Sequence, residues 1–187
     1  MAFLDTLVVE PLPPALEAGG FDCGEGELTA YLCDGTAHGD RIANVACTYL
    51  VRSNGELVGY FSVLADAIRL ESKERPVGVR YSSAPALKLG RMGVAQQHQG
   101  KKAGQWILDY VVGMARVMAE QVGVRYVTLD ALKRDPLVAW YEKYGFVRNR
   151  GQAKAWAKLL GLASKDELEH VSMRFDILLE AQIAMQI

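Results

Sequence analysis

Cysteine is scarce in this sequence, and its placement excludes two kinds of stabilisation. The chain contains three cysteines, Cys23, Cys33 and Cys47, which are odd in number and widely spaced, without a Cys-x-x-Cys pair. Such a set fits neither a disulfide framework nor a zinc site. The three histidines also lack metal-ligand spacing. We therefore predict ordinary reduced thiols and no bound metal.

Long apolar runs are also missing. No run reaches the roughly 18 residues that a membrane-spanning helix needs. The first residues, 1–5, do not combine a basic region with an apolar stretch, so they do not resemble a secretory signal. We therefore expect a cytoplasmic protein. Its 187 residues fit a single domain (1–187), and half of them are hydrophobic, which is enough for a core.

Basic residues are absent from positions 1–40, which contain eight acidic residues and therefore sum to −8. The remaining residues, with 21 basic and 14 acidic side chains, carry +7. This asymmetry favours an anionic ligand on one side of the molecule, but a solvated acidic helix beside ordinary mixed surface explains it equally well. It permits a nucleic-acid partner without requiring one, and the sequence pI of 6.3 is low for an RNA-binding protein.

Apolar patterns and turn residues predict antiparallel hairpins first and alternating strands and helices afterwards. We expect strands at 8–9, 46–51, 57–64, 67–70, 86–94, 126–132 and 171–178, and helices at 25–33, 104–121 and 137–144. Asn54-Gly55 supplies the chemistry of a hairpin turn. This order indicates an α/β (α+β) architecture with a mixed sheet.

A short loop, Gln99-Gly100-Lys101-Lys102-Ala103-Gly104, lies between the expected strand at 86–94 and the expected helix at 104–121. Backbone N–H groups at the start of a helix attract phosphate, and the two lysines add positive charge. The spacing is neither that of a Walker A loop nor Gly-x-Gly-x-x-Gly. From the residues alone, a plain helix-entry turn with exposed lysines explains the loop equally well.

In its context, the loop resembles the pyrophosphate loop of the GNAT acetyltransferase superfamily, Gln/Arg-x-x-Gly-x-Gly/Ala. Gln99, Ala103 and Gly104 occupy the expected places, whereas Lys102 stands where the family has its first glycine. The preceding segment, 92–96, looks like the family's strand ending in Leu-x-Val. The segment 140–146, Trp-Tyr-Glu-Lys-Tyr-Gly-Phe, looks like its late Phe-Tyr-x-x-x-Gly-Phe signature.

This resemblance implies a GNAT-like mixed, mostly antiparallel twisted sheet flanked by helices, and acetyl-CoA as co-substrate. The residues that it assigns to acetyl-CoA are Met92, Gly93, Val94, Gln99, Gly100, Lys101, Lys102, Ala103 and Gly104. It also implies that Tyr141 is the general acid that protonates the departing thiolate, and that the Val94 N–H meets the thioester carbonyl. A packing aromatic is the alternative role for Tyr141.

A narrower resemblance lies near the N-terminus. Residues 21–32 look like the Phe-x-Cys-Gly-x-x-x-Leu-x-x-aromatic-Leu opening of one GNAT branch, and 88–94 is similar to that branch's Lys-Leu-x-Arg-Leu-x-Val. The branch contains toxins of toxin–antitoxin pairs that acetylate the amino group of aminoacyl-tRNA. It therefore implies an aminoacyl-tRNA substrate, a small antitoxin partner and a homodimer. Because the branch uses direct transfer, we expect Cys23 to be structural.

The expected central strand offers Lys88 and Arg91 but no carboxylate base, and Asp66 and Asp130 are weak substitutes. An α-amino group, with a pKa near 8, needs less activation than a lysine amine, so an α-amine substrate is favoured. We assign Lys88, Arg91, Arg148 and Arg150 to substrate binding. Within 148–170, Arg148, Arg150, Lys154 and Lys158 either face a polynucleotide or form the polar side of a helix, which we favour. Acetylation of a small amine or protein N-terminus, and non-catalytic acyl-CoA binding, stay open as alternatives.

Overall fold

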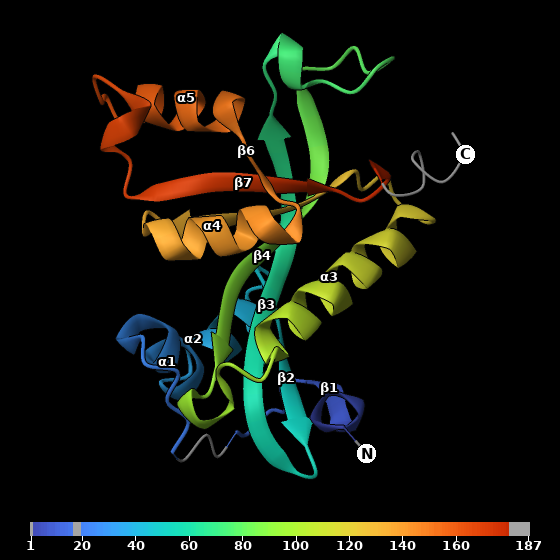
Figure 1. Cartoon of the computed structure of the whole chain (residues 1–187), viewed down its shortest axis with the longest axis vertical. Coiled ribbons are helices and arrows are strands. Elements are labelled where there is room, and N and C mark those ends of the chain that lie inside the picture. The colour runs from blue at the N-terminus through green and yellow to red at the C-terminus, as the bar shows by residue number, and fades with distance from the viewer. Residues whose placement is uncertain (1, 17–19, 180–187) are drawn as a thin grey trace. The chain divides into compact units, whose positions relative to one another are not determined.

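The computed structural model of the chain describes residues 2–16 and 20–179 (Figure 1). Within these residues, the chain forms seven strands and five α-helices, in the order β1-α1-α2-β2-β3-β4-α3-β5-α4-β6-α5-β7. The strands hydrogen-bond in the order β1-β2-β3-β4-β5-β7-β6. Strands β4 and β5 are parallel, whereas β1–β2, β2–β3, β5–β7 and β6–β7 are antiparallel pairs. The prediction of a mixed, mostly antiparallel sheet is confirmed.

The chain divides into two compact units, whose boundaries fall within β3, β4 and α3. Unit 1 comprises residues 1–64 and 89–111, and unit 2 comprises residues 65–88 and 112–187. The single domain over 1–187 therefore stays a prediction. No helix of the described residues is both long and apolar enough to cross a membrane.

Unit 1 is built on a β-hairpin and two short helices. Its elements are η1 (Phe3–Thr6), β1 (Leu7–Pro11), α1 (Gly26–Cys33), α2 (Thr36–Ile42), β2 (Cys47–Ser53), the first part of β3 (Glu56–Arg69), the second part of β4 (Ser83–Val94), η3 (Gln96–His98) and the first part of α3 (Ala103–Ala119). Asn54 and Gly55 have φ of 49° and 85°, which a type I′ hairpin turn requires. The turn predicted there is confirmed.

The structure corrects the prediction of two strands at 57–64 and 67–70, because β3 runs unbroken from Glu56 to Arg69. Asp66 interrupts the apolar pattern but does not break the strand. Its carboxylate accepts hydrogen bonds from the Ala67 N–H at 2.8 Å and from the Thr128 hydroxyl at 2.8 Å. Helix α2 was not predicted, since Ala37 is its only buried residue and Gly39 lies within it.

Unit 2 surrounds strand β5. Its further elements are η2 (Ser72–Glu74), β5 (Tyr126–Leu132), α4 (Asp135–Tyr144), β6 (Val147–Arg148), α5 (Arg150–Leu159), η4 (Lys165–Glu167) and β7 (His170–Asp176). Strand β4 pairs with β5 in parallel, in a register that joins Ala86 to Tyr126 and ends with Lys88 opposite Thr128. The boundaries predicted for β5 are confirmed, and α4 ends as predicted at Gly145, which has a φ of 117°.

Helix α5 is held in unit 2 by the buried carboxylate of Glu74. This carboxylate accepts hydrogen bonds from the N–H groups of Arg150 and Gly151, both at 2.9 Å, and pairs with Arg174 at 2.8 Å. Burial by itself raises the pKa of Glu74, but the backbone hydrogen bonds and the Arg174 charge outweigh it and lower the pKa. A Cβ atom on Gly151 would lie 2.6 Å from the Arg69 carbonyl oxygen, so only glycine permits this close approach.

Candidate active site

The end of β4 in unit 1 lies very close to Tyr60 and Cys23 and to the backbone at Gly59. A Cβ atom on Gly93 would lie 2.8 Å from Cε1 of Tyr60 and 3.3 Å from Sγ of Cys23. A Cβ atom on Gly59 would lie 2.5 Å from the Gly93 carbonyl oxygen. Packing within unit 1 therefore explains these glycines. Met92 and Val94, on either side of Gly93, are half-buried.

Gln99 joins the end of β4 to the N-terminal motif at residues 21–32. Its Nε2 donates to the Cys23 carbonyl oxygen at 2.8 Å and to the Val94 carbonyl oxygen at 3.0 Å. A second hydrogen bond joins the same two regions: Nε2 of Gln96 donates to the Asp22 carboxylate at 2.7 Å. The motif thus braces the strand end and the start of the loop from within unit 1. Cys23 is buried, and its Sγ lies 3.4 Å from the Thr29 hydroxyl, as a structural cysteine would.

The loop reaches α3 through two residues with left-handed backbone conformation. Gly100 has a φ of 76° and Lys102 a φ of 64°. The Lys102 carbonyl accepts the first hydrogen bond of α3, from the Trp106 N–H at 3.0 Å. Lys102 therefore adopts a conformation that favours glycine, at a cost of about 1–2 kcal/mol for a residue with a Cβ.

The loop has the charge and geometry that a pyrophosphate requires. The side chains of Lys101 and Lys102 are exposed, and Nζ of Lys101 lies 5.6 Å from the centre of the Phe3 ring. The first N–H groups of a helix have no intrahelical acceptor, and the 17-residue α3 adds its positive pole. No Cβ clash limits the approach at Gly100, which has no neighbour within 4 Å of that position.

Tyr141 lies on α4 in unit 2, among aromatic side chains. Its ring makes edge contacts with Trp140 and Phe146, at centroid distances of 4.9 and 5.7 Å. Burial raises the pKa of Tyr141 to about 12. Within residues 2–16 and 20–179, the hydroxyl makes no hydrogen bond to the protein. It is therefore protonated at neutral pH and available to a ligand.

The two carboxylates considered as bases are both engaged within unit 2. Asp130 pairs with Nζ of Lys88 at 2.5 Å, and Asp66 accepts the Thr128 hydroxyl. Burial raises the pKa of Asp130, while Lys88 acts in the opposite direction. The ammonium group of Lys88 also lies 5.5 Å from the centre of the Trp156 ring. Lys88 is thus occupied by contacts of its own unit.

The other residues assigned to substrate binding belong to both units. Arg91, in unit 1, stacks on the Tyr31 ring at 5.3 Å. In unit 2, Arg148 pairs with Glu142 at 2.8 Å, with both side chains well exposed, and Arg150 is exposed at the start of α5. Within the described part of unit 2, the side chains of Lys88, Arg148 and Arg150 share no ion-pair partner.

Residues 44–148 match the family model described as the acetyltransferase (GNAT) domain. The chain belongs to the GNAT acetyltransferase family. The match covers more than half of the chain and includes β4, the loop, α3 and α4. GNAT enzymes are acyl-CoA N-acyltransferases that use acetyl-CoA as co-substrate.

Solved structures of GNAT toxins share this fold over almost the whole chain. AtaT complexed with acetyl-methionyl-tRNAfMet has a TM-score of 0.76 and 19% identity, and the alignment covers 96% of this chain and 99% of AtaT. A tyrosine-to-phenylalanine mutant of the AtaT toxin has a TM-score of 0.74 and 18% identity, and the alignment covers 98% of this chain and 97% of the mutant. A tyrosine-to-phenylalanine mutant of KacT has a TM-score of 0.74 and 19% identity, and the alignment covers 95% of this chain and 99% of KacT. No sequence match was found among curated proteins.

Two features of this region were not predicted from the sequence. One is the pair Asp22 and Gln96, whose hydrogen bond spans 74 positions and leaves no signal in local spacing. The other is Lys165 on η4, which was not among the four basic residues considered for a polynucleotide. Its signal was present in the sequence, because residues 148–165 contain five basic side chains and no acidic one.

Proposed function

We propose that this GNAT enzyme transfers the acetyl group of acetyl-CoA directly to the α-amino group of aminoacyl-tRNA, with Tyr141 as general acid. The observation that carries the proposal is the Tyr141 hydroxyl, which burial keeps protonated and which no residue of the described chain binds. The departing thiolate needs a proton, and a positioned hydroxyl supplies one.

The high pKa of Tyr141 constrains how this proton is delivered. A phenol with a pKa of about 12 is a weaker acid than a thiol in water, whose pKa is near 8.5. Tyr141 therefore hydrogen-bonds to the sulfur first, and transfer completes when the thiolate is desolvated, because burial raises the pKa of a thiol as well. The rings of Trp140 and Phe146 pack against Tyr141, and only 8% of the residue is exposed.

Both candidate carboxylate bases are engaged by other residues, which favours an α-amino group as the acceptor. Asp130 is held in an ion pair with Lys88, and Asp66 is bound by Thr128. Neither carboxylate is free to take a proton from a lysine-like amine. An α-amine with a pKa near 8 is partly neutral at physiological pH, so it attacks the thioester without a dedicated base.

Acetyl-CoA supplies an activated thioester, and unit 1 provides its binding groups. Lys101, Lys102 and the N–H groups of residues 100–104 would hold the pyrophosphate at the pole of α3. Met92, Gly93 and Val94 would line the pantetheine arm, with the Val94 N–H donating to the thioester carbonyl oxygen. Gln99 keeps the end of β4 in place through its two hydrogen bonds to carbonyl oxygens.

The solved structures support the choice of acceptor and partner. AtaT has been solved with acetyl-methionyl-tRNAfMet, and also bound to the C-terminus of its antitoxin AtaR together with acetyl-CoA. By this likeness, we propose an aminoacyl-tRNA acceptor, a homodimer and a small antitoxin protein. Expression of the protein without an antitoxin is then expected to arrest growth.

The decisive experiment incubates the protein with aminoacyl-tRNA and labelled acetyl-CoA. Acetyl transfer to the aminoacyl group is expected to speed up with pH until the α-amine is neutral, near pH 8, because the neutral amine is the nucleophile. It is expected to show no alkaline loss until the pH approaches the pKa of Tyr141, about 12. A decline near pH 9 would show that another group supplies the proton.

One observation favours a different acceptor. The sequence pI of 6.3 suits an enzyme of small amines or protein N-termini better than an RNA-binding enzyme. Transfer to free amino acids or peptides at a higher kcat/KM than to aminoacyl-tRNA would establish that alternative. Acetyl-CoA binding in calorimetry without acetyl transfer to any of these amines would instead identify a non-catalytic acyl-CoA-binding module.

A further inference from the structure

Positive charge is concentrated in one segment of unit 2. Residues 148–165, here called the basic segment, contain five lysines and arginines and no acidic residue. The whole chain carries −1, so the rest of the molecule carries −6. Attraction of a polyanion therefore depends on this local surface and not on the overall charge. The low pI is compatible with RNA binding if the contact is confined to the basic segment.

The segment has a fixed shape because α5 is anchored at its N-terminus. Glu74 binds the N–H groups of Arg150 and Gly151, and Oε1 of Gln152 accepts the Arg69 N–H at 2.8 Å. Glu74 already occupies the positive pole of α5. An anionic ligand is thereby directed away from the helix end, to the lysine side chains of α5 and to Lys165 of η4, whose other two residues, Asp166 and Glu167, are acidic.

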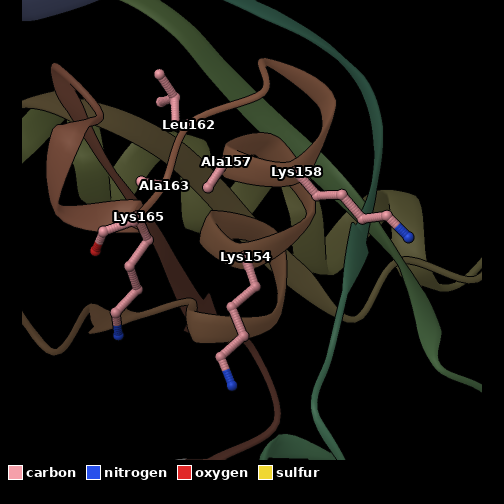
Figure 2. Close-up of a pocket in the computed structure, with 7 residues that line it drawn as sticks. Lys154, Ala157, Lys158, Leu162, Ala163 and Lys165 are labelled. Atoms are coloured by element: carbon pink, nitrogen blue, oxygen red, sulfur yellow. The ribbon is translucent and has the colours of Figure 1, made fainter.

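These side chains surround an open cavity of ≈ 480 Å³ (Figure 2). It is lined by Lys154, Ala157, Lys158, Leu162, Ala163, Ser164 and Lys165. Lys154 and Lys158 are one turn apart on α5. Figure 2 shows the side chains of Lys154 and Lys165 extending in the same direction, whereas that of Lys158 extends to one side. The small residues between them leave room for a ligand.

Most of the positive charge at the cavity is uncompensated. Lys154 forms an ion pair with Glu71, and its side chain is 65% exposed. The ammonium groups of Lys158 and Lys165 form no ion pair or hydrogen bond with any residue of the ranges 2–16 and 20–179. Ser164 is turned inward, since its side chain caps η4 by accepting the Asp166 N–H at 3.1 Å. The lysines are thus the groups free to meet an anion.

We propose that the cavity formed by α5 and η4 binds the phosphate backbone of the acceptor tRNA through Lys154, Lys158 and Lys165. The identity of this RNA rests on the proposed function. Lysines act on phosphate as flexible point charges, and the cavity has no aromatic lining on which a base would stack, so it contacts the backbone and reads no sequence. Arg150, exposed at the start of α5, extends the charge beyond the cavity, which suits a repeating polyanion better than a single phosphate.

The test measures binding of uncharged tRNA to the full-length protein by fluorescence anisotropy at several salt concentrations. The triple variant Lys154→Gln, Lys158→Gln, Lys165→Gln is expected to bind at least about tenfold more weakly at low salt. Its slope of log affinity against log salt concentration is expected to be smaller by about 2, because each lost phosphate contact removes roughly 0.7–0.9. The matched variant with arginine at all three positions keeps the charge and is expected to keep the affinity.

Acetyl-CoA binding, measured by calorimetry, checks that both variants are folded, because the loop of unit 1 is unchanged in them. If the glutamine variant is unfolded, the single variant Lys165→Gln is measured in its place. Its slope of log affinity against log salt concentration is expected to be smaller than that of the wild type by roughly 0.7–0.9. Wild-type affinity in the glutamine variant would overturn the proposal. So would binding of a polyglutamate peptide by a protein that binds no tRNA, since that result would assign the cavity to an acidic protein partner.

The inference and the proposed function fail in different ways. Lysine-dependent tRNA binding without acetyl transfer to aminoacyl-tRNA would support RNA binding at the cavity and contradict the proposed function. Acetyl transfer with an unchanged KM for aminoacyl-tRNA in the glutamine variant would support the proposed function and contradict RNA binding at the cavity. The expected result is a KM for aminoacyl-tRNA that rises about tenfold, with an unchanged KM for acetyl-CoA.

Discussion

The two units differ in charge and in the kind of group that carries their chemistry. Unit 1 has ten acidic and five basic residues and sums to −5, whereas unit 2 has 12 acidic and 16 basic residues and sums to +4. In unit 1, the candidate acetyl-CoA site is formed largely by backbone, held by Gln99 and by the left-handed turn at Lys102. In unit 2, the candidate groups are individual side chains, Tyr141 and the lysines of the basic segment. Single substitutions should therefore affect function more strongly in unit 2.

Loss of the Tyr141 hydroxyl is the largest expected effect. Tyr141→Phe keeps the aromatic packing but removes the proton donor, so kcat is expected to fall about 10²–10⁴-fold. The KM for acetyl-CoA is expected to stay within a factor of about three. The assay is acetyl transfer to aminoacyl-tRNA. Tyr144→Phe, on the same helix, is the matched control and should retain activity; equal losses in the two variants would assign Tyr141 to packing alone.

Removal of the Glu74 charge comes next and concerns stability. Glu74→Gln leaves Arg174 buried without its counter-charge, which is expected to lower the free energy of unfolding by about 3 kcal/mol at pH 7. Because the folded-state pKa of Glu74 is lowered, its contribution is complete above the unfolded-state pKa, near 4.3, and is lost as the pH falls through the folded-state value. Urea unfolding should therefore show a difference between wild type and variant that shrinks below about pH 4. A constant difference would contradict this origin.

Loss of the Gln99 side chain, which joins the end of β4 to Cys23 in unit 1, should have a smaller effect. Gln99→Ala removes two hydrogen bonds to carbonyl oxygens, each with a net value of about 1 kcal/mol. We expect unfolding to become easier by about 1–2 kcal/mol and the KM for acetyl-CoA to rise several-fold, since the strand end and the loop lose their shared support. Thermal unfolding and initial rates measure the two effects. A rise in KM without any loss of stability would instead indicate a direct contact of Gln99 with acetyl-CoA.

Lys102→Gly is the smallest expected change, and it has the opposite sign. Glycine adopts a φ of 64° without the Cβ clash, so the free energy of unfolding is expected to rise by up to about 1 kcal/mol. Loss of one positive charge should weaken acetyl-CoA binding by less than about threefold. Lys101→Gly removes the same charge at a position without positive φ and should lower stability. Stabilisation by both changes would contradict the strain at Lys102.

Local signals predicted the elements of this fold, and long-range contacts account for what the prediction missed. Strand β5 was predicted with its observed boundaries because Tyr126–Leu132 is continuously apolar apart from Thr128 and Asp130. The break predicted within β3 was wrong because the Thr128 hydroxyl, 62 positions away, binds Asp66. The loop was located correctly, but its attachment to Cys23 through Gln99 spans 76 positions. Such partners are set by the tertiary fold and leave no periodic pattern.

Glu74 also has a consequence for the order in which the chain is assembled. During synthesis, Glu74 is made 76 residues before Arg150 and 100 residues before Arg174. Its carboxylate accepts a local hydrogen bond from the Glu71 N–H at 2.9 Å, but the Arg174 charge becomes available only when β7 has been made. Closing such long loops is entropically costly. Helix α5 therefore gains its anchor among the last contacts of folding. The lysine cavity takes its final shape only at that stage, so a nascent chain that lacks β7 should carry no organised surface for RNA.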